Sequence, residues 1–84
     1  MLKQIKSMGN LVKCDTEDIV VAKIFLKLEE MERSLRWLSN KCDFNYNSFY
    51  AIMRQRTMRL TPAYLEKINE LLLTDYCIEN GGQL

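Results

Sequence analysis

The chain contains no histidine, and it has one proline and three glycines among its 84 residues. Without histidine, the side chain that most often serves as a general base or a zinc ligand is missing. No cysteine pair has CxxC spacing, no serine or cysteine has an identifiable activating partner, and no glycine-rich phosphate loop is present. We therefore expect no enzyme activity, no metal ion, no cofactor and no small-molecule ligand.

The three cysteines, Cys14, Cys42 and Cys77, are an odd number at wide and irregular spacing. This pattern argues against a disulfide framework and favours reduced side chains that pack as small hydrophobic groups. The sequence also lacks a long apolar run and the apolar core of a signal peptide. These absences predict a cytoplasmic protein with no membrane segment.

Apolar residues recur at three- and four-residue steps in two long segments, as in helices that bury one face. The first segment covers residues 15–32. The second opens at Thr61-Pro62, where Thr suits the N-cap and Pro suits the first helical position, and it has room to reach about Cys77.

Between these segments, residues 34–60 have the pattern of two short helices joined by a tight turn. Ser34 and Asn45 are N-cap candidates, because their side-chain oxygens can accept from backbone N–H groups of a first turn. Asp43 tolerates the left-handed conformation that such a turn needs. The second short helix would run over residues 46–54, with an inward stripe of Phe49, Ile52 and Met53.

We therefore predict an all-α fold, in which residues 15–77 form a compact bundle of four or five helices that contains a helix-turn-helix. Residues 1–14 fit a short strand or hairpin and a partly ordered arm equally well, and residues 78–84 fit a mobile tail. The predicted core is Val21, Ile24, Phe25, Leu28, Leu38, Cys42, Phe44, Phe49, Ile52, Leu65, Ile68 and Leu72.

Positive charge is concentrated in the middle of the chain. Residues 33–61 carry six cations against one acid, whereas residues 1–32 carry five against six and residues 62–84 carry one against four. Five of the six central cations are arginines, which suit bidentate contacts to phosphate and guanine. Charge alone fits a solvated basic surface about as well as a nucleic-acid-binding surface.

The stretch SLRWLSNKCDFNYNSFYAIMRQRTMRLTPAYLEKINELL resembles the helix-turn-helix of phage repressor and Cro proteins, the Xre-type family. The resemblance covers about residues 19–73. The chain departs from the family at Leu35, where a phosphate-contacting Gln is common, and at Asp43, where Gly is preferred. Residues 1–14 are extra, and the usual fifth helix is short or missing. The matching positions are, in order, Ser34, Ser39, Cys42, Asp43, Phe44, Phe49, Ile52, Arg56 and Pro62.

The resemblance implies a small phage- or mobile-element-type transcriptional regulator, a repressor of the Cro type. It would bind specific double-stranded DNA sequences in the cytoplasm, at the nucleoid, with residues 45–54 as the recognition helix and as a homodimer. The residues implied to contact bases are Tyr46, Asn47, Tyr50 and Ala51. The residues implied to contact phosphates are Arg36, Lys41, Arg54, Arg56 and Arg59.

These residues also have plainer interpretations. Asn45 fits a cap better than a base contact, and Trp37 fits core packing better than a DNA contact. Tyr46 and Tyr50 can equally form a protein-binding patch. The alternative function is therefore a helix-turn-helix-shaped module that binds a host protein instead of DNA, and the total charge of only +1 favours it.

Overall fold

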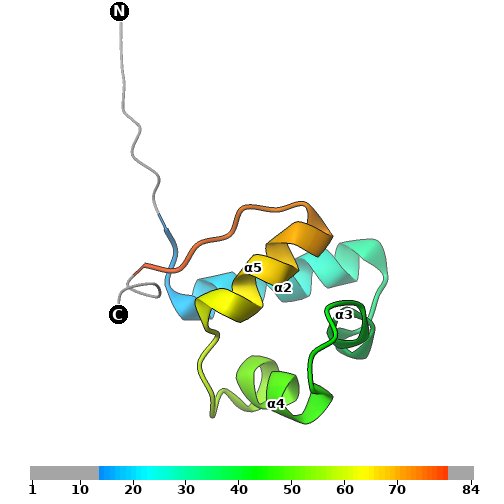
Figure 1. The fold of residues 1–84 in the computed structure, drawn as a ribbon. Coiled ribbons are helices and arrows are strands. Elements are labelled where there is room, and N and C mark those ends of the chain that lie inside the picture. The colour runs from blue at the N-terminus through cyan, green and yellow to red at the C-terminus, as the bar shows by residue number, and fades with distance from the viewer. Residues whose placement is uncertain (1–13, 80–84) are drawn as a thin grey trace, which may run out of the picture.

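A computed structural model of the protein describes residues 14–79, and within them four α-helices and one π-helical turn follow one another with short connections (Figure 1). The predicted all-α bundle is confirmed, while the predicted N-terminal arm falls almost wholly outside the described residues. None of the described helices is long and apolar enough to cross a membrane. The elements are α2 (Glu17–Met31), α3 (Leu35–Lys41), α4 (Tyr46–Tyr50), the π-helical turn η1 (Ala51–Gln55) and α5 (Pro62–Leu72).

Each α-helix starts at a residue whose side chain caps it. In every case the capping oxygen accepts a hydrogen bond from the backbone N–H three residues later. This bond satisfies an amide that has no partner inside the first turn. The predicted caps at Ser34, Asn45 and Thr61 are confirmed. The full set of N-cap residues is Thr16, Ser34, Asn45 and Thr61.

A left-handed residue produces the sharp turn between α3 and α4, as the sequence predicted. Asp43 has φ 62°, its N–H donates to the Asn40 carbonyl, and the Phe44 N–H donates to the Ser39 carbonyl. These two bonds form a Schellman motif, which closes the end of α3 and redirects the chain. The turn therefore sets α4 across α3 at a defined angle.

Every helix contributes to one hydrophobic core. Ten of the twelve predicted core residues are buried, and the other two, Phe25 and Phe44, pack against the core while partly exposed. Leu60 is buried although it lies in a loop, where no helical periodicity marks it. The buried hydrophobic residues absent from the predicted core are Val20, Leu35, Met53 and Leu60.

Helix α5 ends at Leu72, so the predicted continuation to about Cys77 is wrong. Leu73 adopts φ 59°, and residues 74–79, here called the C-terminal strap, run without helical structure back toward the start of α2 (Figure 1). The Asn69 amide holds the strap, because Oδ1 accepts from the Tyr76 N–H at 2.9 Å and Nδ2 donates to the Tyr76 carbonyl at 2.8 Å. The spacing of the leucines does not show that the Asn69 side chain binds backbone groups further along the chain, so the pattern did not indicate where α5 ends.

The strap pairs with the residues that precede α2. The Asp15 N–H donates to the Cys77 carbonyl at 3.0 Å, and the Glu79 N–H donates to the Asp15 carbonyl at 2.8 Å. These bonds make a parallel bridge between Asp15 and Ile78. Residues 78 and 79 therefore belong to the folded unit, while residues 80–84 of the predicted tail lie outside the described part.

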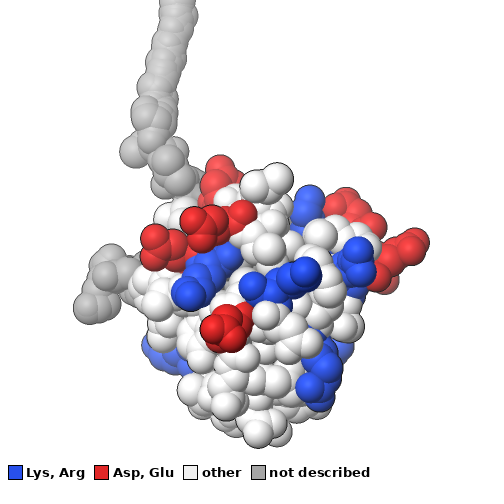
Figure 2. All heavy atoms as spheres, turned by 45° about the vertical axis from the view of Figure 1, so that its right-hand side comes forward, with Lys and Arg blue, Asp and Glu red and all other residues white. Residues whose placement is uncertain are grey.

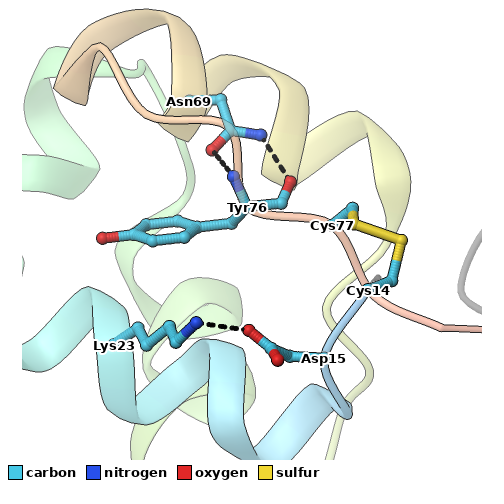
Figure 3. Close-up of a disulfide and its surroundings, with 6 residues drawn as sticks. All are labelled: Cys14, Asp15, Lys23, Asn69, Tyr76 and Cys77. Carbon is cyan, nitrogen blue, oxygen red and sulfur yellow. Dashed lines mark hydrogen bonds and ion pairs between the residues drawn. A yellow bond between two sulfur atoms is a disulfide. The ribbon is translucent and has the colours of Figure 1, made fainter. Parts of the chain in front are cut away.

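A disulfide joins Cys14 to Cys77, with 4.9 Å between their Cα atoms (Figure 3). The expectation that all three cysteines stay unpaired is therefore wrong for these two, whereas Cys42 is free and buried, as expected. The sequence did not reveal this pairing of Cys14 with Cys77, because the pairing depends on the reversal of chain direction at Leu73. Sixty-three positions separate the two cysteines in the sequence, and no local pattern brings them together.

Candidate nucleic-acid interface

The outward side of α4 and η1 carries the four residues predicted to contact bases. Asn47 and Tyr50 are exposed, and Tyr46 and Ala51 are half-buried. The ring centroids of Tyr46 and Tyr50 lie 5.8 Å apart. Tyr46 and Tyr50 are four positions apart, as are Asn47 and Ala51, so the members of each pair are neighbours on the helix surface. On the opposite side the predicted inward stripe is confirmed, since Phe49, Ile52 and Met53 are buried.

Helix α4 continues directly into η1, which is π-helical, and the sequence did not predict this change. The π-helical turn extends through Gln55, and the Arg56 N–H then donates to the Ala51 carbonyl. The wider turn ends when Arg56 adopts φ 57°. A π-helical segment changes the direction of side chains relative to a regular α-helix, and such segments are frequent at functional sites.

Two of the predicted phosphate-contacting arginines stack on aromatic rings. The Arg36 guanidinium lies 4.0 Å from the Tyr46 ring centroid, and the Arg54 guanidinium lies 4.6 Å from that of Phe25. A cation–π contact fixes the position of the guanidinium and keeps its charge. Arg36 therefore brings positive charge to the edge of the outward surface of α4. Lys41 is exposed at the end of α3.

The other two arginines of the predicted set, Arg56 and Arg59, are engaged by acids at the N-terminus of α2. Arg56 pairs with Glu17 at 3.1 Å and with Asp18, and it also donates to the Ile52 carbonyl at 3.0 Å. The hydrogen bond to Asp18, followed by the contacts with Glu17, raises the pKa of Arg56. Arg59 Nε lies 3.6 Å from a Glu17 carboxylate oxygen. Much of the positive charge of these two arginines is thus balanced within the molecule.

Glu17 lies in the first turn of α2, and its side chain connects α2 to residues 56–60, here called the basic loop. Its side chain is 16% exposed, and besides its two arginine partners it accepts the Leu60 N–H at 2.9 Å. A carboxylate with this many donors is well placed to hold residues 56–60 beside the end of η1. The sequence could have indicated these ion pairs, because it has an acidic pair at positions 17 and 18 and a dense cluster of arginines at 54–59.

Acidic and basic side chains are also unevenly distributed over the molecular surface. In Figure 2 most of the acidic side chains lie in the upper part of the view, and one lies lower, among basic side chains. The lower end, where α4 lies in Figure 1, is largely uncharged and is bordered by basic side chains. A neutral surface flanked by cations can meet the base edges of a groove while the cations meet phosphates.

The structure also has a pocket beneath the C-terminal strap, here called the hollow, which lies away from α4. It has a volume of about 430 Å³ and is lined mainly by apolar groups of α5, Leu60 and the strap. None of the predicted base- or phosphate-contacting residues lines it. Among residues 14–79 no cluster of three or more Cys, Asp or Glu side chains could hold a metal ion. The surface of α4 and the basic residues beside it therefore form the candidate site.

Comparisons with known protein families, with curated proteins and with solved structures gave no match. The function of this surface must therefore be inferred from its own geometry and chemistry.

Proposed function

We propose that the protein binds specific sequences of double-stranded DNA, with α4 and η1 in the major groove, as a small phage- or mobile-element-type repressor. One observation carries this proposal: a short helix anchored by Phe49, Ile52 and Met53 presents an uncharged outward side that is bordered by basic residues. The major groove of B-DNA admits an α-helix of this kind. The turn at Asp43 fixes that helix relative to α3, as groove insertion requires.

The exposed polar groups divide into base-contacting and phosphate-contacting roles. Asn47 can donate to and accept from adenine in the major groove, and the Ala51 methyl can contact a thymine methyl. Tyr46 and Tyr50 lie beside them and can contact bases, sugars or phosphates. Asn47 is thus the residue on which sequence preference should depend most.

Positive charge around the helix supplies the contacts to the DNA backbone. Arg36, Lys41 and Arg54 make no ion pair within residues 14–79, so their charge is available for phosphates. Arg59 is held only through one 3.6 Å contact and can turn toward a phosphate. Arg56 contributes mainly by keeping the basic loop in place, because two carboxylates already pair with it.

One recognition helix reads only a few base pairs, so we propose that two copies bind an inverted repeat as a homodimer. The site of action would be the DNA of the cytoplasmic nucleoid. Dimer formation would place two α4 helices in successive major grooves on the same side of the duplex.

Selection from a random duplex library tests this proposal. We expect enrichment of an inverted repeat with half-sites about one helical turn apart. Asn47→Ala should relax the preference at one position of each half-site by about 5- to 150-fold, equivalent to about 1–3 kcal/mol. Lys41→Ala should weaken binding to all sequences, and Lys67→Ala on α5 is the matched control that should leave binding unchanged. No enrichment, or equal losses from Asn47→Ala on selected and scrambled sites, would contradict the proposal.

A second function, binding of a protein partner, is favoured by the arginine–aromatic contacts near the same surface. Arg36 stacks on Tyr46, and Arg33 lies 5.1 Å from the Trp37 ring centroid. Tyr, Trp and Arg are the residues most enriched where binding energy concentrates in protein interfaces. Recovery of one stoichiometric protein without DNA, and its loss in Tyr50→Ala, would decide for this function.

A further inference from the structure

We propose that Cys14 and Cys77 form a reversible redox latch, which fastens the C-terminal strap to the start of α2 when oxidised and releases it when reduced. In Figure 1 the strap runs along the top of the bundle, whereas α4 lies at the bottom. The redox latch therefore does not depend on the proposed DNA binding.

The backbone around the two cysteines holds them in register independently of the sulfur–sulfur bond. The Asp15 N–H bonds to the Cys77 carbonyl and the Glu79 N–H bonds to the Asp15 carbonyl, so the residues beside both cysteines are already paired. The Cα atoms of Cys14 and Cys77 lie 4.9 Å apart, within the range that a disulfide needs. After reduction the two thiols would remain near each other, which favours re-formation of the bond inside one molecule.

Besides the disulfide and the two backbone bonds at Asp15, the strap is held at few points, so its attachment should respond to the Cys14–Cys77 bond. Asn69 bonds to Tyr76 (Figure 3) and to Thr74, and the half-buried Tyr76 and Ile78 side chains pack against the core. The nearby ion pair between Lys23 and Asp15 is exposed to solvent, where such pairs contribute little. Segments with few buried contacts open at lower free energy than the rest of a fold.

Release of the strap would uncover an apolar surface. Tyr76, Cys77 and Ile78 of the strap line the 430 Å³ hollow together with Leu60 and Leu65. With the strap fastened, Leu60 and Leu65 are buried. With the strap loose, the buried Leu60 and Leu65 side chains would gain contact with water.

The third cysteine should stay out of this chemistry. Cys42 is buried in the core, and its Sγ lies 3.8 Å from the Lys67 carbonyl oxygen. Burial raises the pKa of the Cys42 thiol, although nearby Lys67 opposes the shift, so little reactive thiolate forms there. Cys14 and Cys77 are half-buried and lie at the surface of the strap and its partner segment.

The latch would close by thiol–disulfide exchange with a small disulfide such as oxidised glutathione. One cysteine thiolate attacks the glutathione disulfide, which forms a mixed disulfide and releases one glutathione thiol. The second cysteine thiolate attacks the protein sulfur of the mixed disulfide, which forms the Cys14–Cys77 bond and releases the second glutathione thiol. Two electrons and two protons leave the protein thiols and are carried by the two glutathione thiols.

A glutathione titration tests whether the pair is reversible. Wild-type protein is equilibrated with mixtures of reduced and oxidised glutathione, free thiols are alkylated after acid quenching, and the peptides are identified by mass spectrometry. We expect a single two-electron transition that links Cys14 to Cys77, with Cys42 alkylated at every ratio. Persistent mixed disulfides with glutathione, or a bond to Cys42, would overturn the proposal.

Amide hydrogen exchange tests whether the bond controls the strap. After reduction, the amides of Asp15, Tyr76 and Glu79 should exchange at least about tenfold faster relative to the core amide of Leu38. Cys42→Ser is the matched control and should show the same reduction-induced change as the wild type. The double variant Cys14→Ser/Cys77→Ser should exchange like reduced wild type under both conditions. An equal acceleration at strap and core amides would show a general staple and overturn the latch.

Discussion

Among residues 14–79, Ser39 is the polar residue whose side chain is fully enclosed. Its Oγ donates to the Phe44 carbonyl at 3.2 Å, across the turn that separates α3 from α4. A small side chain is needed here because α3 and the turn meet closely, and a hydroxyl is useful because the carbonyl would otherwise lack this donor. Ser39 therefore couples the close packing of the turn to the position of α4.

Replacement of Ser39 should separate the role of its size from that of its hydroxyl. Ser39→Ala should lower the free energy of unfolding by about 1 kcal/mol, since one buried hydrogen bond is lost. Ser39→Leu should lower it by at least about 3 kcal/mol, because the site has no room for a larger side chain. Urea unfolding measures both values, and Ser48→Ala, which removes a hydroxyl with no such bond, should stay within about 0.5 kcal/mol. Equal effects from Ser39→Ala and Ser48→Ala would contradict the assignment.

We expect Tyr76 to make the attachment of the strap sensitive to alkaline pH. Burial raises the pKa of its hydroxyl, Glu30 and Asp75 raise it further, and Lys23 opposes them. Because the folded pKa exceeds the unfolded value of about 10, stability from the neutral hydroxyl is complete below that pH and is lost as pH rises through the folded pKa. We expect the phenolate absorbance of the folded protein to show a late step, above the ordinary tyrosine pKa of about 10, that comes from Tyr76. Tyr76→Phe should remove that late step, while Tyr50→Phe should leave it.

At the level of whole elements, the helix ends depend on residues in left-handed conformations. Glu32, Asp43, Arg56 and Leu73 all have positive φ values without being glycine. A side chain in this region costs about 1–2 kcal/mol, except that Asp and Asn bear it more easily. Leu73 ends α5 in this way and is 90% exposed, so its side chain contributes almost no packing in return.

Leu73→Gly should therefore stabilise the protein by about 1 kcal/mol, because glycine adopts the left-handed conformation without a steric penalty. The matched control is Leu26→Gly, at a 63% exposed position in the middle of α2. That variant should be less stable by about 1 kcal/mol, since glycine weakens a helix interior. Thermal and urea unfolding measure both changes. A loss of stability in Leu73→Gly would mean that the leucine makes contacts that matter in solution.

Glu17 should be the residue that holds the basic loop against α2. Glu17→Ala leaves the Leu60 N–H without this acceptor, and we expect a loss of about 2–3 kcal/mol in the free energy of unfolding. Glu17→Gln keeps an acceptor oxygen and should lose only about 1 kcal/mol. Glu66→Ala on α5 replaces an exposed glutamate and serves as the control, with no change above about 0.5 kcal/mol. Equal losses from the Ala and Gln variants would show that the charge, not the hydrogen bond, positions the loop.

The elements that the sequence predicted well are those set by near neighbours. The caps at Ser34, Asn45 and Thr61 act on backbone groups three residues away, and Asp43 needs only its own conformational preference. The strap was missed because it depends on the Asn69 amide and on Cys14, which lie outside its own stretch of sequence. The arginine partners Glu17 and Asp18 were missed for the same reason, since they lie 38 or more positions from Arg56.

At the scale of the whole molecule, the disulfide closes nearly the entire described chain into one loop. Cys14 and Cys77 are 63 positions apart, so the bond brings the two ends of the described residues together. The all-α class was predictable from helical periodicity, but this long-range closure was not.

Charge is the other property that belongs to the whole molecule, and it gives the proposed function a quantitative test. Six phosphates would be neutralised by a dimer in which the unpaired Arg36, Lys41 and Arg54 each contact one, so the slope of log affinity against log salt should be about −5. If Arg59 of each copy also turns to a phosphate, the slope should be about −7. Lys41→Ala should reduce the magnitude of that slope by about 2, because one contact is lost from each copy. Lys67→Ala removes an equivalent charge on α5 and should leave the slope unchanged. Binding isotherms from 50 to about 300 mM salt measure the slopes. A slope near zero, or equal changes from the two lysine variants, would rule out this surface as the one that meets the DNA backbone.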